Sequence, residues 1–298
     1  MPNSSLDEKR LEVLNETASR RSRLLLITEL PEWYQRNDYM LTGYRPPTYS
    51  LSTCVTSLTY IHNETANIFS HLLPAIWTVG AQLLLWKAFW SNFPNADFRE
   101  YGIFALNLFA ATVCFSLSAG YHTVINHSER ILDLSTRIDY VGILLMIVGN
   151  FISGIYVAFY CQPALQKTYW TMIVILSALT ASMVLHPAYQ HRRYRLIRLA
   201  AFVATGLSGF VPVIHAIRIH DPERLWKSGL AHYYSEGALF IFGAFLYGTH
   251  LPERLYPGTF DTWFHSHFLF HCFVVAAVAV HYRGAWIAFD WIYHTGQC

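Results

Sequence analysis

Seven apolar segments, each about 20 residues long, fill most of the sequence after residue 66 and restrict the folds that it can form. The bilayer core offers no water to hydrogen-bond a bare backbone, so a spanning segment must be a helix or part of a closed barrel, and runs of this length favour helices. Only 13% of the residues are charged, against about 25% in soluble proteins. We therefore expect an all-α, polytopic membrane protein with seven transmembrane helices, at residues 68–90, 102–123, 138–160, 169–186, 196–218, 230–249 and 267–289.

Two regions of different composition follow one another along the chain. Residues 1–50 are predicted to be a polar cytosolic leader and interfacial segment, and residues 51–298 the seven-helix membrane domain. The first residues lack the apolar core of a signal peptide. Residues 6–27 predict a charged helix, which suits either a membrane surface or solvent. The stretch that follows is typical of the lipid interface, where Trp and Tyr concentrate; it contains Pro31, Trp33, Tyr34, Tyr44, Arg45, Pro46 and Pro47.

The distribution of basic residues predicts the orientation. Seven spans put the two termini on opposite sides, and most of the 21 lysines and arginines fall on the side of the N-terminus. The positive-inside rule therefore places the N-terminus in the cytosol. We expect the protein to lie in the plasma membrane or the endoplasmic reticulum. The glycosylation sequons at Asn3, Asn15, Asn63 and Asn126 lie on the same side, so we expect none to be used. The cysteines are scattered without a paired motif, and we expect neither a disulfide framework nor a cysteine-rich zinc site.

Four ionisable side chains interrupt the apolar segments: His122, Asp139, His267 and His271. Such groups are costly inside a membrane and tend to be functional. The alternation of helix direction places all four near the cytosolic face, with His122 closing the second helix and Asp139 opening the third. His267 and His271 are four residues apart, so they share one helix face. Three histidines with an open fourth position form the catalytic type of zinc site, where Ser118 and Asp139 could orient water and Asp139 could act as general base.

Each of these residues also has an ordinary structural interpretation. A histidine pair at this spacing is weak evidence for a metal unless a third ligand joins it. Asp139 could be a helix N-cap near the interface. Ser118 could simply pack, because small residues are common in membrane helices. Only the combination on one face favours zinc.

Other polar side chains gather at the same predicted face. Glu64, Asn67 and His71 form one stripe at the start of the first helix, either as a shell around the metal or as an ordinary helix-start cluster. Tyr247 could contact a lipid carbonyl or only pack. We expect His186 to anchor the interface, His250 to be structural and His265 to be at most a spare ligand.

Several separated motifs resemble the progestin and adiponectin receptor family, which includes haemolysin-III-like proteins and fungal zinc-homeostasis membrane proteins. The resemblance implies a seven-helix fold with a cytosolic N-terminus, zinc on His122, His267 and His271, Ser118 and Asp139 beside its water, and ceramidase-type activity in a lipid cavity. The leader before Leu30 supports no particular extracellular ligand. The motifs are LPEWYQRNDYMLTGYRPP (30–47), HNETANIFSHLLPA (62–75), SxxxH (118–122), RIDYVGI (137–143) and PERLYPGTFDTWFHSHFLFH (252–271).

Two functions fit these residues. The first is an intramembrane zinc hydrolase that cleaves ceramide or another acyl amide into a fatty acid and an amine, with a signalling role in lipid metabolism and metal homeostasis. The second is a non-enzymatic receptor in which a structural zinc clips helices together. A zinc transporter fits poorly, because the opposite halves of the helices offer few polar ligands. No basic stripe with interleaved aromatic residues suggests nucleic acid.

Overall fold

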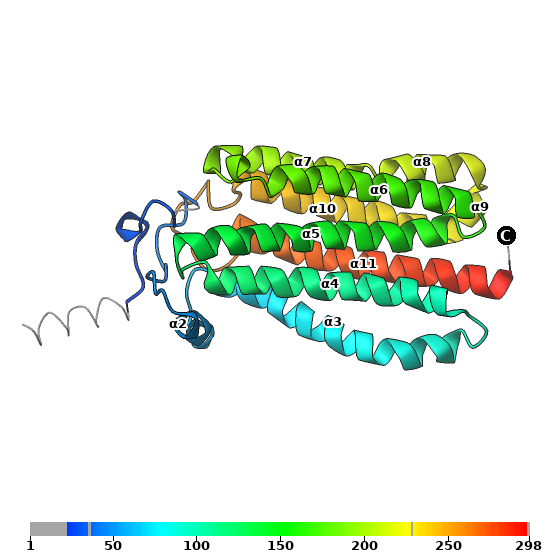
Figure 1. Ribbon diagram of the computed structural model, residues 1–298, viewed down its shortest axis with the longest axis horizontal. Coiled ribbons are helices and arrows are strands. Elements are labelled where there is room, and N and C mark those ends of the chain that lie inside the picture. The colour runs from blue at the N-terminus through cyan, green and yellow to red at the C-terminus, as the bar shows by residue number, and fades with distance from the viewer. Residues whose placement is uncertain (1–22, 35–36, 228, 297–298) are drawn as a thin grey trace, which may run out of the picture.

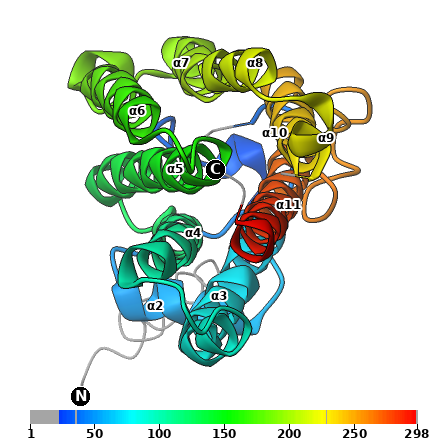
Figure 2. The same cartoon turned by 90° about the vertical axis from the view of Figure 1, so that its right-hand side faces the viewer.

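Seven long helical segments run side by side along the molecule in the computed structural model, which describes residues 23–34, 37–227 and 229–296 (Figure 1). Seen from one end, α5 lies between α4 and α6, and α11 lies between α3 and α10 (Figure 2). Apart from an isolated bridge between Leu25 and Tyr44, these residues contain no β-structure, which confirms the all-α class. The segments are α3 (Thr65–Asn92), α4 (Phe98–Val124), α5 (Glu129–Ala158), α6 (Pro163–Val184), α7 (Arg195–Leu207) continued by α8 (Phe210–Ile219), α10 (Leu230–Thr249) and α11 (Ser266–Thr295).

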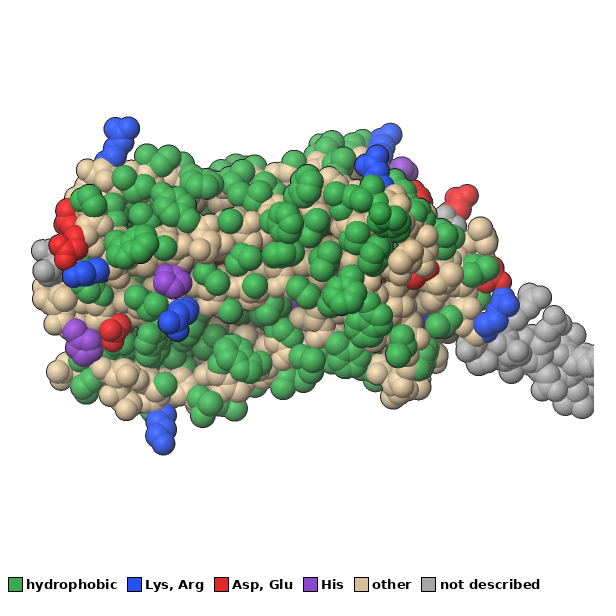
Figure 3. Space-filling view, turned by 180° about the vertical axis from the view of Figure 1, so that it is seen from behind, with side chains coloured by type: hydrophobic (Ala, Val, Ile, Leu, Met, Phe, Trp, Pro, Cys, Tyr) green, Lys and Arg blue, Asp and Glu red, His purple; other side chains and the backbone are tan. Residues whose placement is uncertain are grey.

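Six of these described segments are long and apolar enough to cross a membrane. The fifth of them, Arg192–Ile219, is broken into α7 and α8 between Leu207 and Phe210. The remaining long helix, α10, is not among these six, and its first turns carry His232, Tyr233, Tyr234 and Glu236. Hydrophobic side chains cover the middle of the surface, while charged ones lie mostly near the two ends (Figure 3). That distribution suits a helix bundle that is immersed in lipid.

The third predicted helix begins earlier than its apolar segment suggests. Ser128 caps α5 by accepting a hydrogen bond from the Ile131 backbone, so the helix starts at Glu129. Asp139 consequently lies within α5, and the prediction that it opens the helix is wrong, as is the alternative that it is an N-cap. Hydropathy misplaced this boundary because the first turns of α5 are polar.

Close contact between α4 and α5 depends on Gly149. A Cβ atom built on Gly149 would lie 2.6 Å from the Cβ of Ala110, which is closer than two such atoms can approach. A Gly149→Ala substitution should therefore separate the two helices and destabilise the protein by roughly 1–3 kcal/mol. Thermal unfolding of the purified protein in detergent tests this expectation. Gly80→Ala is the matched control, because nothing lies within 4 Å of that position, and equal melting temperatures for both variants would contradict the packing argument.

The segment before α3 folds over one end of the bundle. Tyr34 and Tyr44 are buried with Leu30, Ile125 and Leu132 in one apolar cluster. The expectation that these aromatic side chains lie at the lipid interface is therefore wrong for both tyrosines. The predicted helix at residues 6–27 lies mostly outside the described residues; in residues 23–27, which are described, Leu25 pairs with Tyr44 and no α-helix forms.

The cysteines differ from their predicted state at one position. Cys161, which follows α5, is disulfide-bonded, whereas Cys54, Cys114 and Cys272 are free. The sequence predicted no disulfide framework and did not indicate this bond, because spacing along a sequence does not show which cysteines folding brings together. Cys161 lies beyond the end of α5 that is distant from His122.

Candidate metal centre

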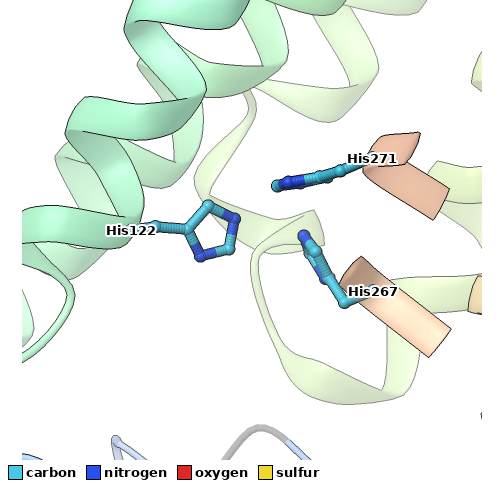
Figure 4. A group of neighbouring side chains, drawn as sticks. All are labelled: His122, His267 and His271. Atoms are coloured by element: carbon cyan, nitrogen blue, oxygen red, sulfur yellow. The ribbon is translucent and has the colours of Figure 1, made fainter. Parts of the chain in front are cut away.

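Three histidines converge at one end of the bundle. His122 lies two residues before the end of α4, and His267 and His271 lie in the first two turns of α11. One nitrogen of each ring lies within 4.8 Å of the corresponding nitrogens of the other two. The ring centroids are 4.7–5.0 Å apart, and the rings face a common centre (Figure 4). Sequence reasoning selected the same three residues, and the structure brings them together.

Hydrogen bonds at Nδ1 fix two of the rings. The carboxylate of Glu64 lies 2.7 Å from His122 Nδ1, and Asn67 donates to the same carboxylate oxygen. His271 Nδ1 lies 3.0 Å from the Ser70 hydroxyl and 3.2 Å from the Asn67 carbonyl. These contacts leave Nε2 of each ring as the ligand atom.

His122 Nε2 gives an independent indication of a ligand. This atom is buried and has no hydrogen-bond partner among the described residues. Buried polar atoms are nearly always paired in native proteins. Three imidazoles, two of them oriented by a second hydrogen bond, are also the donor set that zinc prefers. The residues present therefore fit a zinc ion.

Arg45 positions the backbone of the first candidate ligand. It is fully buried and donates to the backbone carbonyls of His122, at 2.6 Å, and Thr123, at 2.9 Å, and to the hydroxyl of Ser57. A cation at this place also stabilises the C-terminus of α4. Sequence analysis placed Arg45 at the lipid interface and missed this role, because nothing in its local pattern indicates burial.

Glu253 fixes the start of α11, where the other two histidines lie. It is fully buried and accepts hydrogen bonds from the backbone and hydroxyl of Ser266 and from the amide of Asn37. Burial alone would raise the pKa of this carboxyl, but the neighbouring His250 side chain and the hydrogen bonds from Ser266 outweigh burial and hold the pKa at about 2. The carboxylate is therefore charged at neutral pH and suits the positive end of the helix dipole.

Ser118 and Asp139 lie beside the histidine cluster. The Ser118 hydroxyl is a hydrogen-bonding partner of the Asp139 carboxyl. Both residues line a cavity of about 360 Å³, whose wall also includes His267 and His271. The rest of that wall is mainly apolar and comes from α5, α7, α8, α10 and α11. A polar cluster at one end of an apolar cavity can bind an amphiphile with its head at the histidines.

Two further predicted residues contact the cluster. The His71 ring stacks on His271 with centroids 3.7 Å apart, and neither His71 nitrogen has a hydrogen-bond partner among the described residues. The Tyr247 ring lies edge-on to His267 at 5.1 Å. Both side chains line the cavity.

The remaining predicted histidines and sequons lie elsewhere. His265 is the N-cap of α11 and accepts from the Phe268 backbone, so it does not belong to the group that could hold a metal ion. His186 caps a 3₁₀ turn (Pro187–Tyr189), and His250 pairs with Glu253 at 3.6 Å. The sequon residues Asn63 and Asn126 are both 1% exposed; Asn3 and Asn15 lie outside the described residues.

Glu64 should tune the affinity of the centre through His122. A Glu64→Gln substitution removes the carboxylate that orients the ring and raises its basicity, so we expect zinc affinity to fall by roughly 10–100-fold. Competition with a fluorescent zinc chelator measures this change. Glu100→Gln is the control, since Glu100 is also buried but lies in the first turn of α4, at the opposite end. An equal zinc affinity in both variants would refute the role of Glu64 in orienting the His122 ring.

The fold and the site together define a multi-pass helical membrane protein with a candidate metal centre at one end. The chain belongs to the haemolysin-III-related family, whose model matches residues 59–282. It is 36% identical over 278 residues to progestin and adipoQ receptor-like protein 1 of Caenorhabditis elegans, covering 91% of this chain and 62% of that protein. It is 35% identical over 265 residues to ADIPOR-like receptor IZH2 of Saccharomyces cerevisiae, covering 88% and 83%.

A rice relative is named for its seven helices. The heptahelical transmembrane protein ADIPOR1 of Oryza sativa is 31% identical over 316 residues, covering 88% of this chain and 83% of that protein. Its name agrees with the seven long segments described above. The predicted membrane fold and the predicted family are thus confirmed. The chain spans about three fifths of the length of the worm relative.

Proposed function

We propose that this protein is an integral-membrane, zinc-dependent lipid amide hydrolase of ceramidase type, with a receptor or signalling role in lipid metabolism and metal homeostasis. One observation carries the proposal: three histidines converge next to Asp139 and Ser118 at the polar end of an apolar cavity. The names of the worm and yeast relatives contain the word receptor and support the signalling part of the proposal.

The residues divide into those that hold the metal and those that move protons. His122, His267 and His271 would hold zinc through their free nitrogens. When bound, zinc would polarise an amide carbonyl and lower the pKa of a water molecule to about 7. Asp139 accepts the proton of the attacking water and returns it to the leaving amine. Ser118 keeps the Asp139 carboxyl in place by its hydrogen bond.

The overall reaction consumes one water molecule for each amide. The C–N bond breaks, the hydroxyl of the water goes to the acyl carbon, and its proton goes to the nitrogen. The products are a fatty acid and an amino-alcohol base. The apolar wall of the cavity binds the acyl chain and excludes bulk water from the polar end.

The disulfide at Cys161 supports a cytosolic position for the metal centre. Disulfides persist in oxidising compartments and are rare in the cytosol. Cys161 follows the end of α5 that is distant from the histidines, so the histidine end would face the cytosol. This orientation agrees with the bias of the basic residues.

Hydrolysis by the purified protein is the direct test. Zinc-loaded protein in detergent should release fatty acid and amino-alcohol from a doubly labelled ceramide in equal amounts. A His267→Ala variant should release neither, and His186→Ala, which changes a histidine outside the centre, should match the wild type. Equal release by the wild type and the His267→Ala variant would refute the proposal.

A non-enzymatic receptor with a structural zinc is the second candidate. It is favoured by the relatives' names and by the way the histidines join α4 to α11. In that case the histidine variants would lose thermal stability and signalling together, and no catalysis would be detected.

A further inference from the structure

A second polar cluster crosses the bundle at half height. Asn107 of α4 donates to Asn150 of α5 at 3.0 Å, and Asn150 donates to Glu236 of α10 at 2.8 Å. The other oxygen of Glu236 lies 2.7 Å from Nδ1 of His281 on α11. His281 Nε2 lies 2.8 Å from the Ser153 hydroxyl. Sequence analysis expected few polar ligands in this half of the helices and singled out none of these residues.

This cluster belongs to the same cavity as the metal centre. His271 lines one part of the cavity, and Asn150, Glu236 and His281 line another. His281 follows His271 by ten residues, which corresponds to about 15 Å along α11. Charged groups at such a depth are costly and usually functional. The hydrolysis proposed above uses none of them.

The position of Ser153 away from the cavity argues against a nucleophilic role. Ser153 contacts His281, which contacts Glu236, and a catalytic triad links serine, histidine and carboxylate in the same sequence of contacts. However, the Ser153 hydroxyl also lies 3.0 and 3.1 Å from the backbone carbonyls of Gly149 and Asn150, and these compete with His281 Nε2 for its single proton. Ser153 is also absent from the cavity wall. Its role is to fix the His281 ring, which leaves Nδ1 for Glu236.

Glu236 and Tyr233 can each form a further hydrogen bond on the side of the cluster that faces the cavity. The Glu236 side chain lines the cavity and is 13% exposed, and each carboxylate oxygen can accept a further bond. Tyr233 also lines the cavity, and its hydroxyl is buried without a partner among the described residues. Tyr233 lies three residues before Glu236, so both share one face of α10.

Glycine at position 154 leaves room at this wall. A Cβ built on Gly154 would lie 3.2 Å from the Tyr233 ring and 3.4 Å from the His281 ring. The two rings are 5.7 Å apart and nearly perpendicular. Tyr233, Glu236 and His281 therefore form one compact polar patch on an otherwise apolar wall.

We propose that Tyr233 and Glu236 form a subsite for a hydroxyl group carried partway along the hydrocarbon chain of a lipid whose head lies at the metal centre. The Tyr233 hydroxyl donates a hydrogen bond to the ligand oxygen, and the Glu236 carboxylate accepts a hydrogen bond from the ligand hydroxyl. The inference rests on the proposed function, because the cavity must hold a lipid chain. It adds that the preferred lipid is hydroxylated in mid-chain, since a hydroxyl there satisfies polar atoms that a plain chain leaves unpaired.

Equilibrium binding to the purified, zinc-loaded full chain tests the subsite. The probes are stearate and a series of hydroxystearates in which the hydroxyl moves along the chain. We expect one mid-chain isomer to bind about tenfold more tightly than stearate. Tyr233→Phe should abolish that preference and leave the affinity for stearate unchanged. Glu236→Gln, which keeps the shape of the side chain, should weaken it. Tyr282→Phe is the control, because Tyr282 lines a separate groove and should keep the full preference.

The outcomes separate this inference from the function on which it rests. Equal affinity for stearate and every hydroxystearate would overturn the subsite while leaving a lipid-binding cavity in place. The subsite would also be overturned if every hydroxystearate bound more tightly than stearate, whatever the position of its hydroxyl, or if the preference for one isomer survived in Tyr233→Phe. Failure of the wild type to bind any fatty acid would overturn both the cavity's proposed role and the subsite.

Discussion

An Asp139→Asn variant is expected to lose ceramide turnover by roughly 10²–10⁴-fold and to keep its zinc. The substitution preserves the size of the side chain and its hydrogen-bonding contact with Ser118 but removes the basic oxygen. Because Asp139 lies beside the three histidines and does not belong to the group that could hold a metal, zinc content should not change. Single-turnover kinetics and metal analysis of the same preparation measure both quantities.

This variant also separates the two candidate functions. Asp133→Asn, an exposed position on the same helix, is the matched control and should behave as the wild type. Unchanged turnover in Asp139→Asn would remove Asp139 from the mechanism. If instead the wild type shows no turnover while the histidine variants lose stability, the structural-zinc receptor would be the better description.

Removal of zinc is expected to abolish turnover and to lower thermal stability. A ligand that binds only the folded chain stabilises that chain, so stripping it with a chelator should lower the melting temperature. Re-addition of zinc should restore both turnover and melting temperature. A chelator selective for calcium is the control and should leave both unchanged, because neutral imidazoles are poor ligands for that ion.

Turnover and melting temperature after zinc removal together distinguish a catalytic zinc from a structural one. If turnover disappears and the melting temperature falls only slightly, zinc acts mainly in catalysis. If the melting temperature falls steeply and turnover was never present, zinc acts as a clip between α4 and α11. Turnover that is equal with and without the chelator would exclude the metal from the reaction.

The convergence of the three histidines follows from simple features of the sequence. Apolar length predicts the spans, and each span reverses the direction of the chain. His122 at the end of one helix and His267 at the start of another must then lie at the same face of the membrane. His271 joins His267 at the site because residues four apart on a helix lie on one side of it.

Other parts of the site depend on tertiary packing that leaves no local pattern. Arg45 is buried because the leader folds over the end of α4, and hydropathy alone suggests an exposed interfacial residue. The start of α5 is polar, so the apolar segment underestimates the helix and misplaces Asp139 at its first turn. Glu236 and His281 are far apart in sequence and look like isolated polar residues until α10 and α11 pack together.

Metal analysis of the purified wild type beside His122→Ala tests the central claim most directly. The account predicts about one zinc per chain in the wild type and close to none in the variant, with His186→Ala matching the wild type. Zinc that is absent from the wild type, or that remains at the same stoichiometry in His122→Ala, would contradict it.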